Sequence, residues 1–369
     1  MNSLTVACQT LMSALLTLMP SAYQQDTLKS LLGLFLKPIG RPLPEHCQTK
    51  SPGAISRFLN HYPWPTRQLI RSRRAWMLSQ LLSWTPAAGR RPHLQVILDL
   101  TTLEKTGKFK AFSSAVGWYN RKRGLHLVVM YLVVGPYRIP WNFRLYRGKG
   151  NPSPAKLALH LLSSLPKSLK SRYQLMVLAD AGFGSKAFFQ GWRRLKLDGL
   201  VGVTCNRRLT DGRLIKHLYH AGQQVFLEGL AFPLTMGYYF FKGEDGRYHK
   251  RYVLSTRRLK ASTLQWWGRR RWQIETFFKV IKHRFGLHRF GQCTKMGVYR
   301  WLLLVLLAFV LALWSHLARP TEQLNWAQAA ELAVRLLMPQ VVITSLLKEL
   351  DRWRDEAHLL SIPIPAASG

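Results

Sequence analysis

Three carboxylates lie at unusual places in a chain that has few acids. Asp99 lies near the end of the apolar run LQVILDL at 94–100, and Asp180 ends the apolar run YQLMVLAD at 173–180. Glu275 is the only acid among the eleven Lys and Arg residues found between residues 257 and 295. A carboxylate at the end of a buried strand is costly unless a cation or a metal ion pairs with it. The three acids are therefore candidate ligands of a divalent metal.

Each acid also has a purely structural interpretation. Asp99 and Asp180 could cap a strand or a turn, and Glu275 could pair with Arg271 four residues before it or with Lys279 four after it. However, a glutamate in a basic helix repels DNA phosphate unless a divalent cation lies between them. Taken together, the acids predict two Mg²⁺ ions, which Mn²⁺ could replace, about 3.5–4 Å apart for phosphodiester cleavage.

The composition points to a polyanionic partner. The chain has 369 residues, with 54 Lys and Arg against 17 Asp and Glu, a formal net charge of +37. A positive field of this size attracts nucleic acid or an anionic membrane surface. The four cysteines are far apart and form no C-x-x-C pair, which is typical of a reducing cytosol. We expect a cytoplasmic, nucleoid-associated DNA-binding protein. A non-enzymatic basic binding protein stays an alternative.

The apolar runs predict a mixed α/β sheet that would position the acids. Strands are expected at 94–100, 112–118, 126–134 and 137–146, before a helix at 152–169. A strand, a helix and a strand then follow, and in open α/β sheets ligands bind at the carboxyl ends of the strands. These later elements are expected at 173–180, 185–197 and 199–206, followed by a β-rich insertion at 207–255 and a helix at 264–287.

We predict three parts along the chain. Residues 1–88 form a helical DNA-binding domain, 89–318 a catalytic domain that contains the insertion, and 319–369 a helical amphipathic tail. The arginines of the first part could instead form a solvated face. The apolar segment 301–318 is long enough to span a bilayer, but a buried helix has the same composition, and we expect no membrane partner. No Lys or Arg precedes the apolar segment 4–19, so a signal peptide is not expected.

Two motifs resemble a known family. The stretch R-W-Q-I-E-T-F-F-K-V-I-K at 271–282 is similar to the Y-x2-R-x3-E-x6-K signature of DDE transposases of the insertion-sequence-four type. Arg271, Glu275 and Lys282 fall on the R, E and K of that signature. The run D-A-G-F-G-S that begins at Asp180 fits the same branch. The resemblance covers about 90–315 and implies a ribonuclease-H-like core.

The resemblance also implies a function and a set of site residues. Asp99, Asp180 and Glu275 would be the catalytic, metal-binding acids, and Arg271 and Lys282 would hold DNA near the cut. The expected activity is cleavage of double-stranded DNA at transposon ends and transfer into target DNA, by a homodimer on DNA. A host DNA nuclease or junction resolvase on the same scaffold is the alternative, because it would use the same acids.

One position departs from the signature. The tyrosine should fall at 268, which is Gly268 here, with two tryptophans just before it. Trp267 could stack on DNA bases in place of the tyrosine, or it could belong to the core. Lys279, on the same basic helix as Glu275, completes the expected DNA-binding residues.

Overall fold

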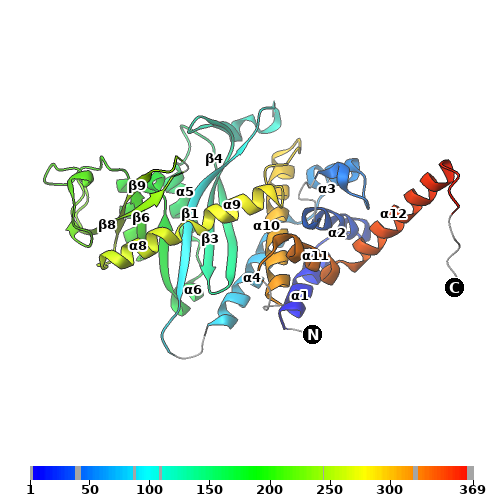
Figure 1. Cartoon of the computed structure of the whole chain (residues 1–369), viewed down its shortest axis with the longest axis horizontal. Helices are drawn as coiled ribbons and strands as arrows, with labels where there is room; N and C mark the ends of the chain where they lie inside the picture. Colours follow the sequence, from blue (N-terminus) through cyan, green and yellow to red (C-terminus); the bar gives the residue numbers. More distant parts are fainter. Residues whose placement is uncertain are drawn as a thin grey trace. The chain divides into compact units, whose positions relative to one another are not determined.

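The computed structural model describes residues 3–37, 43–85, 89–107, 110–243, 245–318 and 323–363 (Figure 1). The chain divides into two compact units. One, called here the sheet unit, comprises residues 74–279. The other, called the helical unit, combines residues 1–73 with 280–369, which are distant in the sequence. The predicted boundaries at 88 and 318 stay predictions, because compactness does not test which segment binds DNA.

The sheet unit contains a mixed sheet whose centre is parallel. β1 (His93–Glu104) pairs in parallel with β5 (Gln174–Ala179), and β5 pairs in parallel with β6 (Asp198–Val203). On the other side of β1 lies the antiparallel β3 (Lys122–Val134), which also pairs with β2 (Val116–Tyr119) and β4 (Tyr137–Tyr146). This arrangement confirms the predicted mixed α/β sheet. β3 and β5 are buried along most of their length, as their apolar sequences require.

The predicted β-rich insertion extends this same sheet. β9 (Tyr248–Ser255) pairs antiparallel with β6, and β8 (Leu234–Lys242) pairs antiparallel with β9. The short β7 (Gln224–Val225) continues the sheet beyond β8. The insertion therefore continues the core sheet beyond β6 with the antiparallel strands β9, β8 and β7.

Two helices of the sheet unit begin at serine caps. Ser153 caps α5 (Pro154–Ser163), and Ser185 caps α7 (Lys186–Arg194). The helix predicted at 152–169 is in fact two, because it stops before Pro166 and α6 (Lys167–Arg172) follows. Short 3₁₀ turns lie at Pro44–His46, Lys110–Ala115, Ala181–Phe183 and Ile215–His217.

The single helix predicted at 264–287 is wrong, because the structure divides it. α8 (Ala261–Arg270) and α9 (Gln273–His283) are separated by Arg271 and Trp272. At the break the backbone N–H groups of Trp272 and Ile274 donate three residues back instead of four. This tighter turn changes the path of the chain just before Glu275.

The helical unit packs around one apolar helix. α10 (Lys295–Leu317) is buried along almost its whole length. By length and composition α10 alone could cross a membrane as a single helix, among the described residues, but its buried environment is that of a core helix. This burial favours the core interpretation of the apolar segment 301–318. The other helices are α1 (Ser3–Thr17), α2 (Ala22–Leu36), α3 (Pro52–Asn60), α11 (Trp326–Leu337), α12 (Pro339–Leu359) and the first part of α4 (Thr66–Trp84).

Candidate active site

The sheet brings two of the predicted acids to the same edge. The parallel pairing of β1 with β5 ends at Leu98 and Ala179. Asp99 and Asp180 are the next residue on each strand, so both lie where the two parallel strands part. Asp99 is not at the end of its strand as predicted, since β1 continues to Glu104 by pairing with β3. The expectation that both acids leave the carboxyl edge of the parallel ladder is nevertheless met.

The structural interpretation of the two aspartates receives little support. Asp180 precedes the 3₁₀ turn Ala181–Phe183, but its side chain accepts no capping hydrogen bond from that turn. Asp99 accepts a hydrogen bond from the backbone N–H of Leu100 at 2.7 Å, which occupies one of its oxygens. The other oxygen of Asp99 is directed to an arginine.

The break between α8 and α9 delivers the third acid and that arginine. Glu275 lies in the first turn of α9, and Arg271 lies in the break itself. Gln273 donates to the side chain of Gln95 on β1 at 3.0 Å and to the backbone oxygen of Arg270 at 3.0 Å. Because Gln95 and Asp99 are four residues apart on one strand, they share a face of the sheet. The Gln273–Gln95 bond therefore fixes the start of α9 beside Asp99.

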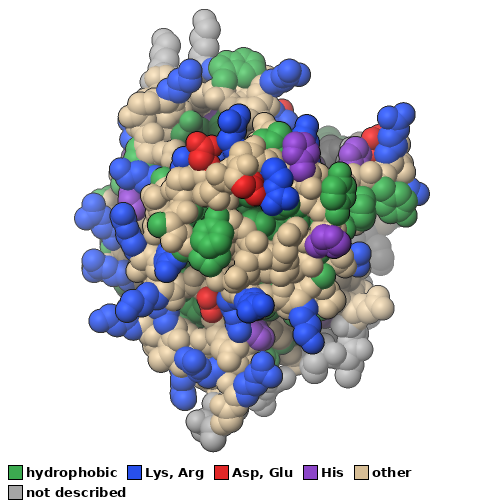
Figure 2. Space-filling model, turned by 90° about the vertical axis from the view of Figure 1, so that its left-hand side faces the viewer, with side chains coloured by type: hydrophobic (Ala, Val, Ile, Leu, Met, Phe, Trp, Pro, Cys, Tyr) green, Lys and Arg blue, Asp and Glu red, His purple; other side chains and the backbone are tan. Residues whose placement is uncertain are grey.

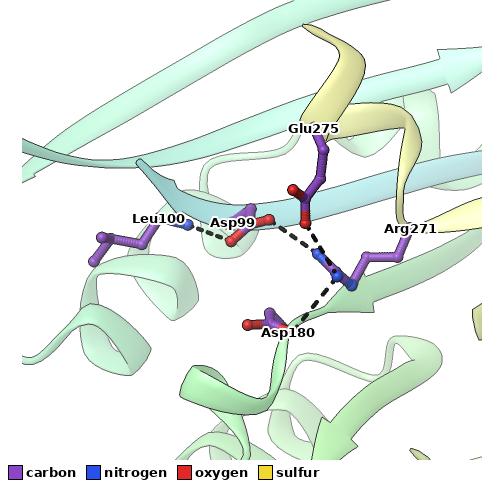
Figure 3. A network of polar contacts seen from close by, with 5 residues as sticks. All are labelled: Asp99, Leu100, Asp180, Arg271 and Glu275. Atoms are coloured by element: carbon purple, nitrogen blue, oxygen red, sulfur yellow. Dashed lines mark hydrogen bonds and ion pairs between the residues drawn. The ribbon is translucent and has the colours of Figure 1, made fainter. Parts of the chain in front are cut away.

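All three acids converge on the guanidinium of Arg271 (Figure 3). One terminal nitrogen of Arg271 donates to Oδ2 of Asp99 at 3.0 Å. The other lies 3.4 Å from Oε1 of Glu275 and 3.7 Å from Oδ1 of Asp180. The Arg271 and Asp99 side chains are 10% and 13% exposed, whereas Asp180 and Glu275 are nearly half exposed. The cluster thus has a buried base and an open side.

The cluster carries more negative charge than its arginine offsets. Burial raises the pKa of Asp99 to about 7, and the charges of Asp180 and Glu275 add to the increase, although Arg271 opposes it. Burial alone would lower the pKa of Arg271, but Asp180 and the other acids raise it overall. Three carboxylates around one guanidinium leave an excess of negative charge, which a divalent cation would neutralise.

The donor set fits a hard divalent cation. Three carboxylates from β1, the end of β5 and α9 offer oxygen ligands of the kind that Mg²⁺ prefers. In the present arrangement Arg271 lies among them, and within the described part of the chain no three Asp, Glu, His or Cys side chains are grouped to hold a metal. The acids that now hold the guanidinium can therefore hold a divalent cation only after Arg271 has moved.

The structure explains the missing tyrosine at Gly268. A Cβ atom at this position would lie 2.5 Å from a ring carbon of Tyr239 on β8. Any larger side chain would clash, because the Tyr239 ring already fills the space beside α8. Tyr239 is also close enough to Arg271 to raise its pKa. Sequence reasoning missed Tyr239, for which the glycine inside a helix was the only signal.

The two tryptophans beside Gly268 differ in exposure. Trp267, predicted as a DNA-stacking residue, is 4% exposed and packs edge-on against His93. This packing favours the core alternative for Trp267. Trp266 is 46% exposed, and the guanidinium of Arg270 lies 3.8 Å from the centre of its ring. Trp266 is thus the more exposed of the two tryptophans.

The predicted lysines lie on α9. Lys279 is exposed and Lys282 is half-buried, four and seven residues after Glu275. Figure 2 shows many Lys and Arg side chains, and few acids, on the end of the sheet unit that carries the inserted strands. Exposed cations of this region are Arg208, Arg213, Lys216, Lys242, Arg247, Arg251, Arg257, Arg258, Lys260 and Arg269. Such a surface suits a nucleic-acid backbone.

Tyr119 is a second residue that sequence reasoning missed. It lies at the end of β2, before a turn in which Asn120 and Arg121 have positive φ angles of 46° and 62°. Burial raises the pKa of its hydroxyl, and the neighbouring Tyr146, Asp180 and Asp99 raise it further. The phenol therefore lies near the acids and stays protonated as a hydrogen-bond donor. Nothing in the local sequence distinguishes it from an ordinary strand tyrosine.

Comparison with known proteins gives a consistent result. A protein-family model described as "Transposase DDE domain" matches residues 90–311. The fold is similar to that of piggyBac transposase in a cryo-EM structure of its synaptic complex with hairpin DNA, with a TM-score of 0.52 and 14% identity. That similarity covers all of this chain and 84% of the other, and it confirms the ribonuclease-H-like α/β fold class. A search of curated proteins finds no match.

Proposed function

The chain belongs to the transposase DDE domain family and is a transposase, and from this premise we propose how its residues act. We propose that Asp99, Asp180 and Glu275 bind two Mg²⁺ ions, or Mn²⁺ in their place, and cut DNA at the ends of a transposable element. The observation that carries this proposal is the convergence of these three acids, from distant parts of the sequence, on the guanidinium of Arg271. A protein that only binds DNA would not need a cluster of three acids.

The metal ions would supply activation of the attacking oxygen and stabilisation of the leaving oxygen when bound. Asp99 and Asp180, which extend from adjacent strands, and Glu275 on α9 are the residues that would hold them. Asp99, fixed at the buried base by Leu100, provides the most rigid ligand. Asp180 and Glu275, on the open side, adjust to the substrate.

Arg271 changes partner during this process. In the structure it offsets part of the negative charge of the acids, which holds the three carboxyl groups together without a metal. A DNA phosphate offers the guanidinium a bidentate anion, so DNA draws Arg271 away from the carboxylates and frees their oxygens. Lys282 and Lys279 on α9 add further phosphate contacts. Ligand exchange at Arg271 therefore links DNA binding to assembly of the metal site.

The finer assignments follow from the sequence. We propose that the transposase is of the insertion-sequence-four type, supported by Arg271, Glu275 and Lys282 at the signature spacing. Its partners would be double-stranded element ends and target DNA, bound by a homodimer in the cytoplasm and nucleoid, with residues 1–88 contacting the ends. The net charge of +37 supports a DNA partner.

The test is a metal-dependent cleavage assay on the DNA that flanks the gene. Asp99→Asn should abolish strand cleavage while leaving affinity for the element ends unchanged or slightly higher. Terminal inverted repeats on both sides of the gene would support the transposase over a host nuclease or junction resolvase. Cleavage by Asp99→Asn at the wild-type rate would show that the metal-site assignment is wrong.

A further inference from the structure

α12 presents an apolar stripe that no part of the described chain covers. None of its residues is buried. Ile343, Leu346, Leu350 and Trp353 are 57%, 55%, 65% and 55% exposed, although leucine, isoleucine and tryptophan are usually buried. Contiguous exposed apolar surface of this kind marks an interaction site. α12 is therefore a candidate docking surface.

The spacing of the stripe is that of a coiled coil. Its members follow one another at intervals of three, four and three residues, which are the a and d positions of a heptad repeat. Ala357 continues the series four residues after Trp353. The heptad assignment places Glu349 at a g position and Arg354 at an e position, beside the stripe.

Three of the four stripe residues, Ile343, Leu350 and Trp353, do not line the cavity that α12 forms with the rest of the helical unit. α12 contacts α2 through another side of its first turns, where Val341 lies against Gly33 of α2. On α12 the cavity between α2, α11 and α12 is lined by Val341, Val342, Ser345, Leu346 and Glu349. Leu346 is the one member of the stripe among them, and it stays 55% exposed. Beyond this point α12 extends past α2 and α11 within the helical unit (Figure 1). Ile343, Leu350 and Trp353 are therefore available to a partner, and so is the exposed part of Leu346.

The charge of α12 decides what kind of partner fits. α12 contains three Lys or Arg and four Asp or Glu, in a chain whose net charge is +37. DNA gains little from a helix of nearly balanced charge. Two copies of so basic a chain repel one another over most of their surfaces, but not along α12. A second copy is thus the occupant that this surface suits.

We propose that α12 pairs with α12 of a second copy in a parallel two-stranded coiled coil. In a parallel pair, a residue at g faces the e residue of the next heptad on the partner helix, and these pairs set orientation. This register places Glu349 opposite the partner's Arg354, and Val342 opposite the partner's Leu347. An antiparallel pair would instead bring g positions together, where Glu349 and Glu356 repel. The charge pattern therefore selects the parallel arrangement.

This inference deepens the proposed homodimer and rests on that part of the proposed function, but it needs no assumption about the metal site. The α12 contact between two copies should form even when no DNA is bound. The test is therefore the mass of the full-length protein in solution, measured by analytical ultracentrifugation without DNA and at moderate salt. The chain has a mass of 42.5 kDa, so wild type should sediment at twice that mass at micromolar concentration.

Leu350→Glu places a charge in the centre of the stripe and should convert the protein to a monomer. Leu359→Glu is the matched control, because Leu359 is 85% exposed on the same helix but outside the a and d positions. The control should stay dimeric, and both variants should keep the wild-type far-UV circular dichroism spectrum, because neither residue is part of the buried core. A monomeric wild type, or a dimeric Leu350→Glu variant, would overturn the proposal.

Charge reversal tests the orientation separately. Glu349→Arg should weaken the dimer at least several-fold, and the double variant Glu349→Arg/Arg354→Glu should restore it. Failure of the double variant to recover would overturn the parallel register. If the wild type were monomeric yet still cut its element ends, the α12 interface would be wrong and the proposed catalytic function would remain.

Discussion

Two buried arginines, one in each unit, have their guanidinium groups satisfied in opposite ways. In the helical unit Arg300 is 5% exposed and donates to the hydroxyl of Thr66 and to four backbone carbonyls of residues 58–64. Its guanidinium also lies 4.0 Å from the centre of the Trp64 ring. In the sheet unit Arg271 is held by three carboxylates.

The pKa shifts of the two arginines run in opposite directions. Burial lowers the pKa of Arg300 to about 10, because only neutral acceptors surround it. The pKa of Arg271 is raised, since the charges of Asp180, Asp99 and Glu275 outweigh its burial. The carbonyl groups around Arg300 are neutral and satisfy its N–H donors without adding charge. The three carboxylates around Arg271 carry more negative charge than its single positive charge offsets. The first cluster therefore stabilises a fold, and the second is charged in a way that a metal ion would complete.

The largest expected effect is on catalysis at the acid cluster. Glu275→Gln removes a proposed metal ligand without changing the shape of the side chain, and it should reduce cleavage by roughly 10²- to 10³-fold or more. Glu104→Gln is the control, because Glu104 forms an exposed ion pair with Lys122 at 2.8 Å. A cleavage assay should show no change in the control. Equal rates for both variants would remove Glu275 from the active site.

Removal of the structural arginine should be the next largest effect. Arg300→Met leaves the carbonyls of the 58–64 segment without their donor, which should cost about 3 kcal/mol of the free energy of unfolding. Arg335→Met, at an exposed i,i+4 pair with Glu331, is the control. Urea denaturation followed by circular dichroism measures both. A loss no larger than that of the control would contradict the structural role of Arg300.

Arg271→Met should make the protein dependent on metal. Without its guanidinium the three acids repel one another, so stability should fall in a chelator and recover on addition of Mg²⁺. Ligand linkage predicts that millimolar Mg²⁺ then stabilises the variant by on the order of 1 kcal/mol more than wild type. Thermal unfolding with and without Mg²⁺ measures this difference. Equal metal-induced shifts in Arg271→Met, Arg300→Met and wild type would show that Arg271 does not compete with a metal.

A further effect on stability concerns the support of Arg271. Gly268→Ala forces a methyl group onto the Tyr239 ring and should cost about 1–3 kcal/mol, as overpacked cores do. Gly291→Ala is the matched control, since a Cβ there meets no atom within 4 Å. Denaturation curves of the two variants measure the difference between their free energies of unfolding. A Gly268→Ala variant as stable as Gly291→Ala would show that the Tyr239 ring can move aside without a measurable loss of stability.

The sequence predicts the acids better than it predicts the elements that hold them. Glu275 was recognisable because it is a lone acid in a basic segment, and Asp180 because it ends an apolar strand. Asp99 was expected at a strand end, but pairing with β3 extends β1 to Glu104, and pairing between distant strands leaves no local signal. The division of the 264–287 helix at Arg271 was missed because helical spacing continues across the break.

The contacts of the buried residues could not be predicted either, because they join distant segments and leave no local signal in the sequence. Arg300 contacts residues more than 230 positions earlier in the chain, and its environment depends on how the helical unit assembles. Trp267 and Trp266 are adjacent and chemically identical, so only the packing against His93 shows which of them is buried. Tyr239 fills the place beside Gly268 from a different strand.

The most direct test of the central claim is a change of metal preference at Asp180. This side chain is nearly half exposed, so Asp180→Cys should fold normally. A thiolate is a soft ligand that Mg²⁺ accepts poorly and Mn²⁺ accepts better. We predict that Asp180→Cys cuts its element ends with Mn²⁺ but not with Mg²⁺, while wild type uses both. The same Mg²⁺ to Mn²⁺ rate ratio in variant and wild type would contradict metal binding by Asp180.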